Sequence, residues 1–114
     1  MESITLRADG ALEAFSALSN EHRLAIFRLL VQAGPEGMAA GDIADKLGIP
    51  ASSLSFHLAH LTRANLAEQR RESRSLIYSA NFPTMNGLIA FMTENCCGGA
   101  SCAPASSPKK RKAS

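Results

Sequence analysis

Three cysteines lie close together near the end of the sequence, in the eight-residue segment NCCGGASC. Thiolates prefer soft, thiophilic ions, and exposed thiols are also oxidised readily. A secreted disulfide framework usually has an even number of cysteines spread along the chain, which differs from the pattern here. We therefore expect Cys96, Cys97 and Cys102 to sit in a reducing compartment and to bind an ion or do redox chemistry.

The spacing of these cysteines would let three sulfurs meet at one point. We expect Cys96 and Cys97 to end the last helix, and GGAS separates them from Cys102. The two glycines allow backbone turns that other residues resist, so the loop can fold back toward the pair. Zinc is a weaker candidate than a three-coordinate ion, because no nearby His or fourth Cys completes its usual four ligands unless another subunit supplies one.

A second group of residues has the chemistry of DNA recognition. Short polar side chains recur in SSLSFHL, where exposed hydroxyl and imidazole groups can hydrogen-bond to base edges. Arginines follow in TRANLAEQRRESR, where they can neutralise phosphates. The alternative is a solvated polar face without a ligand. The candidate DNA contacts are Ser52, Ser53, Ser55, His57, Arg63, Arg70, Arg71 and Arg74.

The overall charge does not explain DNA binding by itself. The chain has 12 basic and 10 acidic residues, a net charge of +2, but four basic residues form the run Lys109–Lys112. Without that run, eight basic residues stand against ten acidic ones, a net charge of −2. DNA affinity of the body must therefore come from local clustering of arginines. The run itself is expected to add non-specific DNA affinity or to act as a solubilising end, more than to serve as a nuclear-localisation string.

Two helices joined by a tight turn must position the polar segment. Ser19 or Asn20 is a plausible N-cap for a helix that stops at Gly34. A short helix is expected over about Ala40–Leu47, and Gly48 and Pro50 then enforce a turn. In the next segment, Leu54, Leu58 and Leu61 form an apolar stripe, as in the second helix of a helix-turn-helix.

The remaining elements complete a mostly α-helical fold with a small β-hairpin. Strands are expected over about Ala67–Arg71 and Leu76–Ala80, with a charged turn between them. A last helix near Pro83 carries an apolar stripe of i, i+3, i+4, i+7 spacing, and a first helix is expected over about Gly10–Leu18. A helix-turn-helix followed by a basic hairpin is a winged helix, whose second helix enters the major groove.

The sequence resembles the arsenic-repressor (ArsR-type) family of bacterial winged-helix regulators. The resemblance is carried by ALSNEHRLAIFRLL, by DIADKLGIPASSLSFHLAHLTRANLAEQRRESRSLIY and by the terminal helix, over about Leu12 to Asn95. It implies a homodimer held by the first and last helices, which binds operator DNA and leaves it when an ion binds. The C-x-C pair of well-known members is missing from AAGDIADKLG, whereas the Cys96–Cys97 pair resembles members that bind the ion at the end of the last helix.

Trivalent arsenic suits three sulfurs, because it forms three bonds and keeps one lone pair. The resulting hypothesis is a cytoplasmic transcriptional repressor that releases operator DNA when arsenite, or antimonite, is bound by the three cysteines. The alternatives are a thiol-redox sensing regulator and a metalloid-binding protein without DNA readout. We find no nucleophile with a base partner and no phosphate-binding glycine loop, so an enzyme is not expected.

The chain divides into three predicted parts. Residues 1–95 form a winged-helix DNA-binding and dimerisation domain, residues 96–102 form the metalloid-binding segment, and residues 103–114 form a disordered basic tail. No apolar run approaches the roughly 20 residues needed to span a bilayer, so no membrane partner is expected.

Overall fold

The computed structural model of the chain describes residues 7–99. Cys102, the run Lys109–Lys112 and the rest of the predicted disordered tail lie outside these residues. The helices are α1 (Ala8–Leu18), α2 (Glu21–Ala33), α3 (Ala40–Leu47), α4 (Ala51–Arg63) and α5 (Phe82–Thr93), and the strands are β1 (Met38–Ala39), β2 (Ala67–Glu72) and β3 (Ser75–Ala80). This order confirms the predicted winged helix-turn-helix, in which α3 and α4 form the helix-turn-helix and β2 and β3 form the wing.

Local sequence signals explain where α2 begins and where α3 ends. The side chain of Asn20 accepts hydrogen bonds from the backbone N–H groups of His22 and Arg23, at 2.9 and 3.1 Å, and so caps α2. Gly48 ends α3 in the left-handed region, with a φ of 67°, and its N–H donates to the carbonyl of Ala44 at 2.8 Å. The tight turn that follows sets the angle between α3 and α4.

The sheet has three antiparallel strands in the order β1-β3-β2. In the hairpin, Ala67 pairs with Ala80 and Glu72 pairs with Ser75. The two expected strands are confirmed and are each extended by one residue toward the turn. Strand β1 was not expected; its two residues pair with Tyr78 and Ile77 on the other edge of β3.

The core lies where α2 and α4 cross and where α3 and the sheet pack against them. The largest fully buried side chains are Ile26, Leu30, Ile43, Leu58, Leu61 and Leu66. Helix α1 turns its small residues inward: Ala11, Ala14 and Ala17 are buried, while Leu12 and Phe15 are exposed. Close packing of α1 through alanines therefore leaves a large apolar surface on its outer side.

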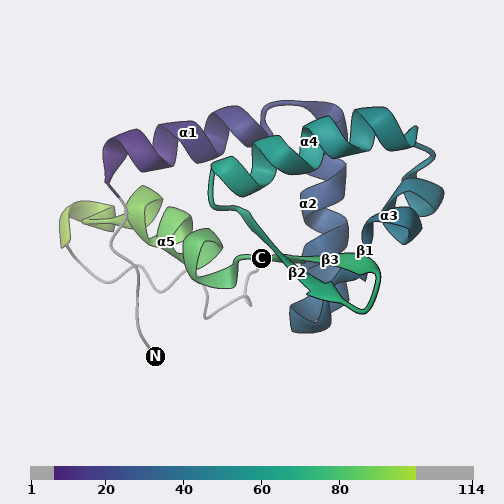
Figure 1. Ribbon diagram of the computed structural model, residues 1–114. Coiled ribbons are helices and arrows are strands. Elements are labelled where there is room, and N and C mark those ends of the chain that lie inside the picture. Colours follow the sequence, from purple (N-terminus) through teal and green to yellow (C-terminus); the bar gives the residue numbers. More distant parts are fainter. Residues whose placement is uncertain (1–6, 100–114) are drawn as a thin grey trace, which may run out of the picture.

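The elements are distributed along one axis of the molecule. Figure 1 shows α1 and α5 together at one end and α3 at the other, with the β2–β3 hairpin extending toward the α3 end. Within the described residues, no helix combines the length and apolar character that crossing a bilayer requires.

Candidate nucleic-acid interface and cysteine segment

Helix α4 presents a continuous exposed face. The exposed residues Ser52, Phe56, Ala59 and Arg63 recur at i, i+4, i+7 and i+11, so they lie along the middle of that face. Ser53 and Ser55, also exposed, flank this line. The predicted exposure of the three serines is therefore confirmed.

Phe56 is a residue of this face that sequence reasoning missed. Its side chain is 62% exposed, although it is large and apolar. Its ring lies edge-on to two histidine rings, with centroid distances of 5.8 Å to His57 and 6.4 Å to His60. The available signal was its position off the leucine stripe of α4, which places it toward solvent.

His57 was expected to be exposed, and this prediction is wrong. Its side chain is only 9% exposed. Leu54, His57, Leu58 and Leu61 repeat at i, i+3, i+4 and i+7, so His57 lies on the stripe that faces the core. We therefore remove His57 from the residues that could reach base edges.

Instead, His57 contacts a buried arginine of α2. Arg23 is 9% exposed; its Nε donates to the carbonyl of Ala17 at 2.7 Å, and its Nη1 lies 3.3 Å from Nδ1 of His57. A guanidinium has only donors, so His57 Nδ1 accepts this hydrogen bond and the ring proton belongs on Nε2. One guanidinium thereby links the end of α1 to α4.

Two further histidines surround this contact. The ring of His22 lies 5.4 Å from that of His57. Burial lowers the pKa of His57 below its ordinary value of about 6.5, and the positive charges of Arg23, His22 and His60 lower it further. Burial also lowers the pKa of His60, whose Nδ1 has no hydrogen-bond partner among the described residues.

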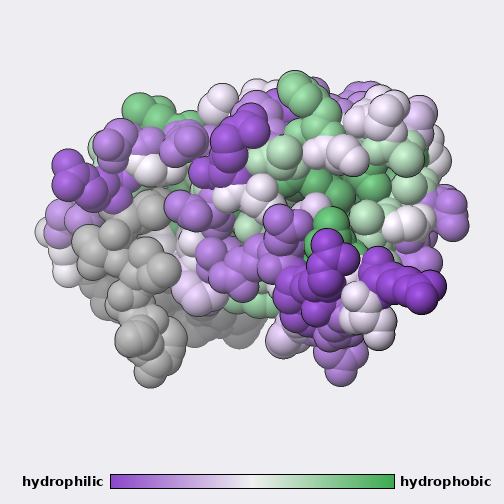
Figure 2. Space-filling view, viewed as in Figure 1, coloured by the Kyte–Doolittle hydropathy of each residue, from purple (hydrophilic) through white to green (hydrophobic). Residues whose placement is uncertain are grey.

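The arginines of the wing differ in their surroundings. Arg70 donates from Nε to Glu72 Oε2 and from Nη2 to the carbonyl of Glu36, both at 2.8 Å. Arg71 and Arg74 are exposed, and neither side chain forms a hydrogen bond or an ion pair within residues 7–99. Figure 2 shows hydrophilic side chains gathered over the tip of the hairpin. With Arg63 exposed at the end of α4, the structure keeps the arginines predicted from the sequence at the surface.

The cysteine pair was expected to end the last helix, and this prediction is wrong. Helix α5 ends at Thr93, and Cys96–Gly99 form a separate 3₁₀ turn in which Cys97 has a φ of 57°. The Sγ atoms of Cys96 and Cys97 lie 3.6 Å apart. Two thiolates on one zinc ion are about 3.8 Å apart, given Zn–S bonds of about 2.3 Å in a tetrahedron, so this separation suits two sulfurs on a shared ion.

The chemical state of the pair bears on ion binding. Cys97 is disulfide-bonded, and Cys96 is not its partner, because a separation of 3.6 Å is far longer than an S–S bond. Among residues 7–99, no group of three His, Cys, Asp or Glu side chains is arranged to hold a metal ion. The predicted third ligand, Cys102, lies outside these residues.

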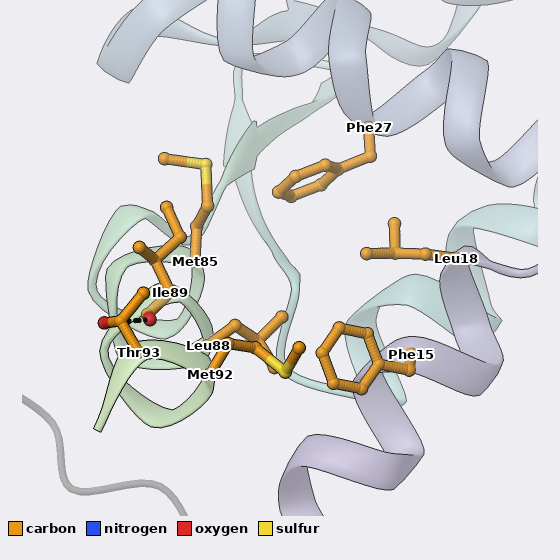
Figure 3. A pocket seen from close by; sticks show the side chains of 8 residues that line it. All are labelled: Phe15, Leu18, Phe27, Met85, Leu88, Ile89, Met92 and Thr93. Carbon is orange, nitrogen blue, oxygen red and sulfur yellow. Dashed lines mark hydrogen bonds between the residues drawn. The ribbon is translucent and has the colours of Figure 1, made fainter. Parts of the chain in front are cut away.

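An apolar groove of about 260 Å³ separates α5 from α1 and α2 (Figure 3). Its lining residues are Phe15, Leu18, Phe27, Met85, Leu88, Ile89, Met92 and Thr93. Figure 3 shows Phe15 pointing across the groove toward Leu88 and Met92. Ile89 and Met92, at the rim, are 56% and 64% exposed. The groove therefore continues into an exposed apolar surface shared by α1 and α5.

An exposed reading helix after a tight turn, followed by an arginine-bearing hairpin, defines a winged-helix DNA-binding protein. Comparison with known proteins agrees: a family described as "Helix-turn-helix domain" matches residues 18–70. Nodulation protein NolR from Rhizobium meliloti is 33% identical over 87 residues, which are 76% of this chain and 69% of that protein.

Solved structures give the family. An ArsR-like transcriptional regulator from Rhodococcus sp. RHA1 superimposes with a TM-score of 0.66 at 25% identity, covering 74% of this chain and 76% of that one. The homodimeric winged helix-turn-helix DNA-binding domain Mb0332 from Mycobacterium bovis gives a TM-score of 0.61 at 27% identity, covering 76% and 81%. The chain belongs to the ArsR-type family of winged-helix transcriptional regulators, and it is a regulator and not an enzyme.

Proposed function

We propose that this regulator binds operator DNA as a homodimer and releases it when its C-terminal thiols capture trivalent arsenic or antimony. The observation that carries the proposal is the 3.6 Å separation of the Cys96 and Cys97 sulfurs, seen with Cys97 oxidised, just beyond the helix that borders the exposed apolar surface. The DNA-reading part rests on the exposed serines of α4 and the exposed arginines of the wing.

The homodimer is supported by the outer surfaces of α1 and α5. Leu12, Phe15, Ile89 and Met92 are large apolar residues that remain between 39% and 68% exposed in the monomer. A second copy, placed on the same surface by two-fold symmetry, would remove them from water. Mb0332, which resembles this chain in structure, is homodimeric.

The thiols would bind the effector in their reduced form. Cys96 and Cys97 supply two sulfurs, and the glycines that follow would allow Cys102 to supply a third. Arsenite and antimonite share the valence and the softness that thiolates select. Capture of the ion would fix the backbone after α5, change how the two subunits sit relative to each other, and so misalign the two reading helices on successive major grooves.

The proposed coupling is moderate in size. An allosteric coupling of about 1–3 kcal/mol loosens DNA binding by roughly 5–150-fold. We propose that the operator overlaps the promoter. The DNA-bound regulator then represses transcription, and release of the DNA by the ion relieves the repression.

The test measures DNA affinity against several effectors in parallel. The probe is a fluorescent duplex selected by the reduced protein from a randomised pool, and the effectors are arsenite, antimonite, cadmium, zinc and peroxide. We expect arsenite and antimonite to release the duplex, and Cys96→Ser, Cys97→Ser and Cys102→Ser each to weaken the response while leaving effector-free affinity unchanged. Release by arsenite from the triple Cys→Ser variant would contradict the thiol site.

A second candidate function, thiol-oxidation sensing, is favoured by one observation. Cys97 is disulfide-bonded, so an oxidised form of this segment is compatible with the fold. In this case peroxide would change DNA affinity, a dithiol reductant would restore it, and arsenite would act only weakly. The same parallel assay separates the two functions.

A further inference from the structure

The contact between Arg23 and His57 joins three helices at a single buried point. Asn20 caps α2 through the backbone N–H of Arg23, at 3.1 Å. The Arg23 side chain then reaches Ala17 at the end of α1 through Nε and His57 on α4 through Nη1. Since α4 carries the exposed face that is proposed to contact DNA, this contact helps to set the position of that face relative to the rest of the domain.

The contact requires a neutral histidine. An arginine stays protonated at any physiological pH, so it can only donate, and His57 can accept only while Nδ1 carries no proton. Protonation of His57 would replace the hydrogen bond with two facing donors and two positive charges. Both effects separate the two side chains.

The charged neighbours do not compensate for that repulsion. Arg23 and His22 face His57 from α2, and His60 faces it from α4 itself; all three disfavour a positive charge on His57. The acidic group in this region, Glu13 of α1, acts on His60 and not on His57. It favours the charged form of His60, whereas Arg23 and Arg63 disfavour that form. No carboxylate is therefore placed to stabilise a protonated His57 in the described part of the chain.

We propose that the Arg23–His57 contact is a pH-sensitive lock that holds α4 in its DNA-binding position while His57 is neutral and releases it when His57 takes up a proton. Arg23 and His57 thus act as positioning residues for the serines of the exposed face. This inference rests on the DNA binding proposed above and is independent of the thiol effector.

The direction of the pH effect follows from the lowered pKa. Because the folded protein holds this proton less tightly than the unfolded chain, the contribution of neutral His57 to stability is complete above its ordinary pKa of about 6.5. It decreases as the pH falls from there toward the lowered folded value. A histidine that contacted phosphate directly would behave in the opposite way, since its protonation would strengthen binding.

The test compares DNA affinity at about pH 7.5 and about pH 5.5, on either side of the ordinary histidine pKa, with the protein reduced and ionic strength fixed. The probe is a duplex selected by the wild-type protein at the higher pH. We expect the wild-type affinity to fall by up to about tenfold, the largest effect that one group with an ordinary pKa of about 6.5 can exert one pH unit below that value. The far-UV circular dichroism is expected to stay native over the same range.

Matched variants identify the group that titrates. His57→Asn keeps an acceptor near Nδ1 that takes up no proton, so its affinity should stay constant between the two pH values. His22→Gln and His60→Gln should keep the wild-type fall. If His57→Asn loses affinity with pH as the wild type does, or if wild-type affinity is unchanged or rises at the lower pH, the lock is wrong.

A direct measurement covers the case in which His57→Asn does not fold. Nitrogen-detected NMR of the wild-type histidines should show His57 as the Nε2–H tautomer at the higher pH, and its protonation should coincide with the loss of DNA affinity. A His57 that is Nδ1-protonated at the higher pH would overturn the proposal. If no duplex is selected at the higher pH, the DNA-binding proposal fails instead, and the tautomer measurement still tests the contact.

Discussion

Arg70 of the wing donates a hydrogen bond from Nη2 to the backbone carbonyl of Glu36, 2.8 Å away and 34 residues earlier in the chain. The same guanidinium pairs with Glu72 through Nε. Arg70 therefore fastens the hairpin to the segment that precedes β1, whereas Arg71 and Arg74 extend from the same hairpin without such contacts in residues 7–99. The three arginines lie close together in the sequence, but we expect them to have different functions.

The first prediction separates these functions by salt dependence. Each phosphate contact contributes about −0.9 to the slope of log K against log salt concentration. Arg71→Ala and Arg74→Ala should each make that slope less negative by about one unit at unchanged stability. Arg70→Ala should change the slope less and should lower the urea midpoint. Equal slope changes for all three variants, measured by fluorescence anisotropy, would contradict the anchoring role of Arg70.

The second prediction concerns Phe56, which lies between Ser52 and Ala59 along the exposed face of α4. An apolar ring in the major groove contacts the C5-methyl group of thymine. Replacing the thymines of a selected duplex with uracils should therefore weaken wild-type binding by about fivefold, near 1 kcal/mol for one lost methyl contact. Phe56→Ala should bind the two duplexes equally, and Phe56→Leu should keep part of the difference. A full difference in Phe56→Ala would show that another residue contacts the methyl groups.

The third prediction uses two glycines four residues apart. Gly37 has a φ of 74°, and a Cβ added there would overlap the carbonyl oxygen of Tyr78, its neighbour on β3. Gly37→Ala should destabilise the domain by about 2–4 kcal/mol, through strain and loss of the β1–β3 pairing. Gly41→Ala is the control, because Gly41 is helical and a Cβ there meets nothing within 4 Å. The control should gain up to about 1 kcal/mol in urea denaturation.

The same comparison would test the position of β1. If Gly37→Ala were as stable as the wild type, the close approach of this segment to Tyr78 would be wrong. The sheet would then consist of the hairpin alone. A destabilised Gly41→Ala would instead indicate a general intolerance of α3 to substitution.

The parts of the fold that were predictable are those with local signals. The cap at Asn20, the left-handed Gly48 and the polar turn between β2 and β3 each fix an element boundary through nearby residues. Strand β1 has only two residues and no periodicity, and its pairing with Tyr78 and Ile77 spans about 40 residues. Such a pairing depends on tertiary contacts that the sequence pattern does not reveal.

The candidate site was predictable in its composition more than in its geometry. The serines and arginines were predicted to lie at the surface from their residue types and positions, and they are exposed. The burial of His57 had a signal, its place among Leu54, Leu58 and Leu61 at helical spacing, but its polar character outweighed that signal. Its partner Arg23 could not be found, because a buried arginine is recognised only from the contacts that satisfy it.

The fourth prediction tests the proposed dimer surface. Ile89 and Met92 are more than half exposed, so replacing both with Glu should leave the fold intact while placing two charges in the seam between subunits. The double variant should be monomeric by light scattering. It should also lose DNA affinity by about 100-fold or more, because two linked reading helices bind one duplex with a high effective concentration.

The control for this prediction is Ala90→Glu, an exposed position of α5 that does not line the groove. It adds a charge to the same helix and should leave both the dimer and the DNA affinity unchanged. A dimeric Ile89→Glu/Met92→Glu variant would place the subunit contact elsewhere. The C-terminal thiols would then lie away from it, and ion capture would need another route to the reading helices.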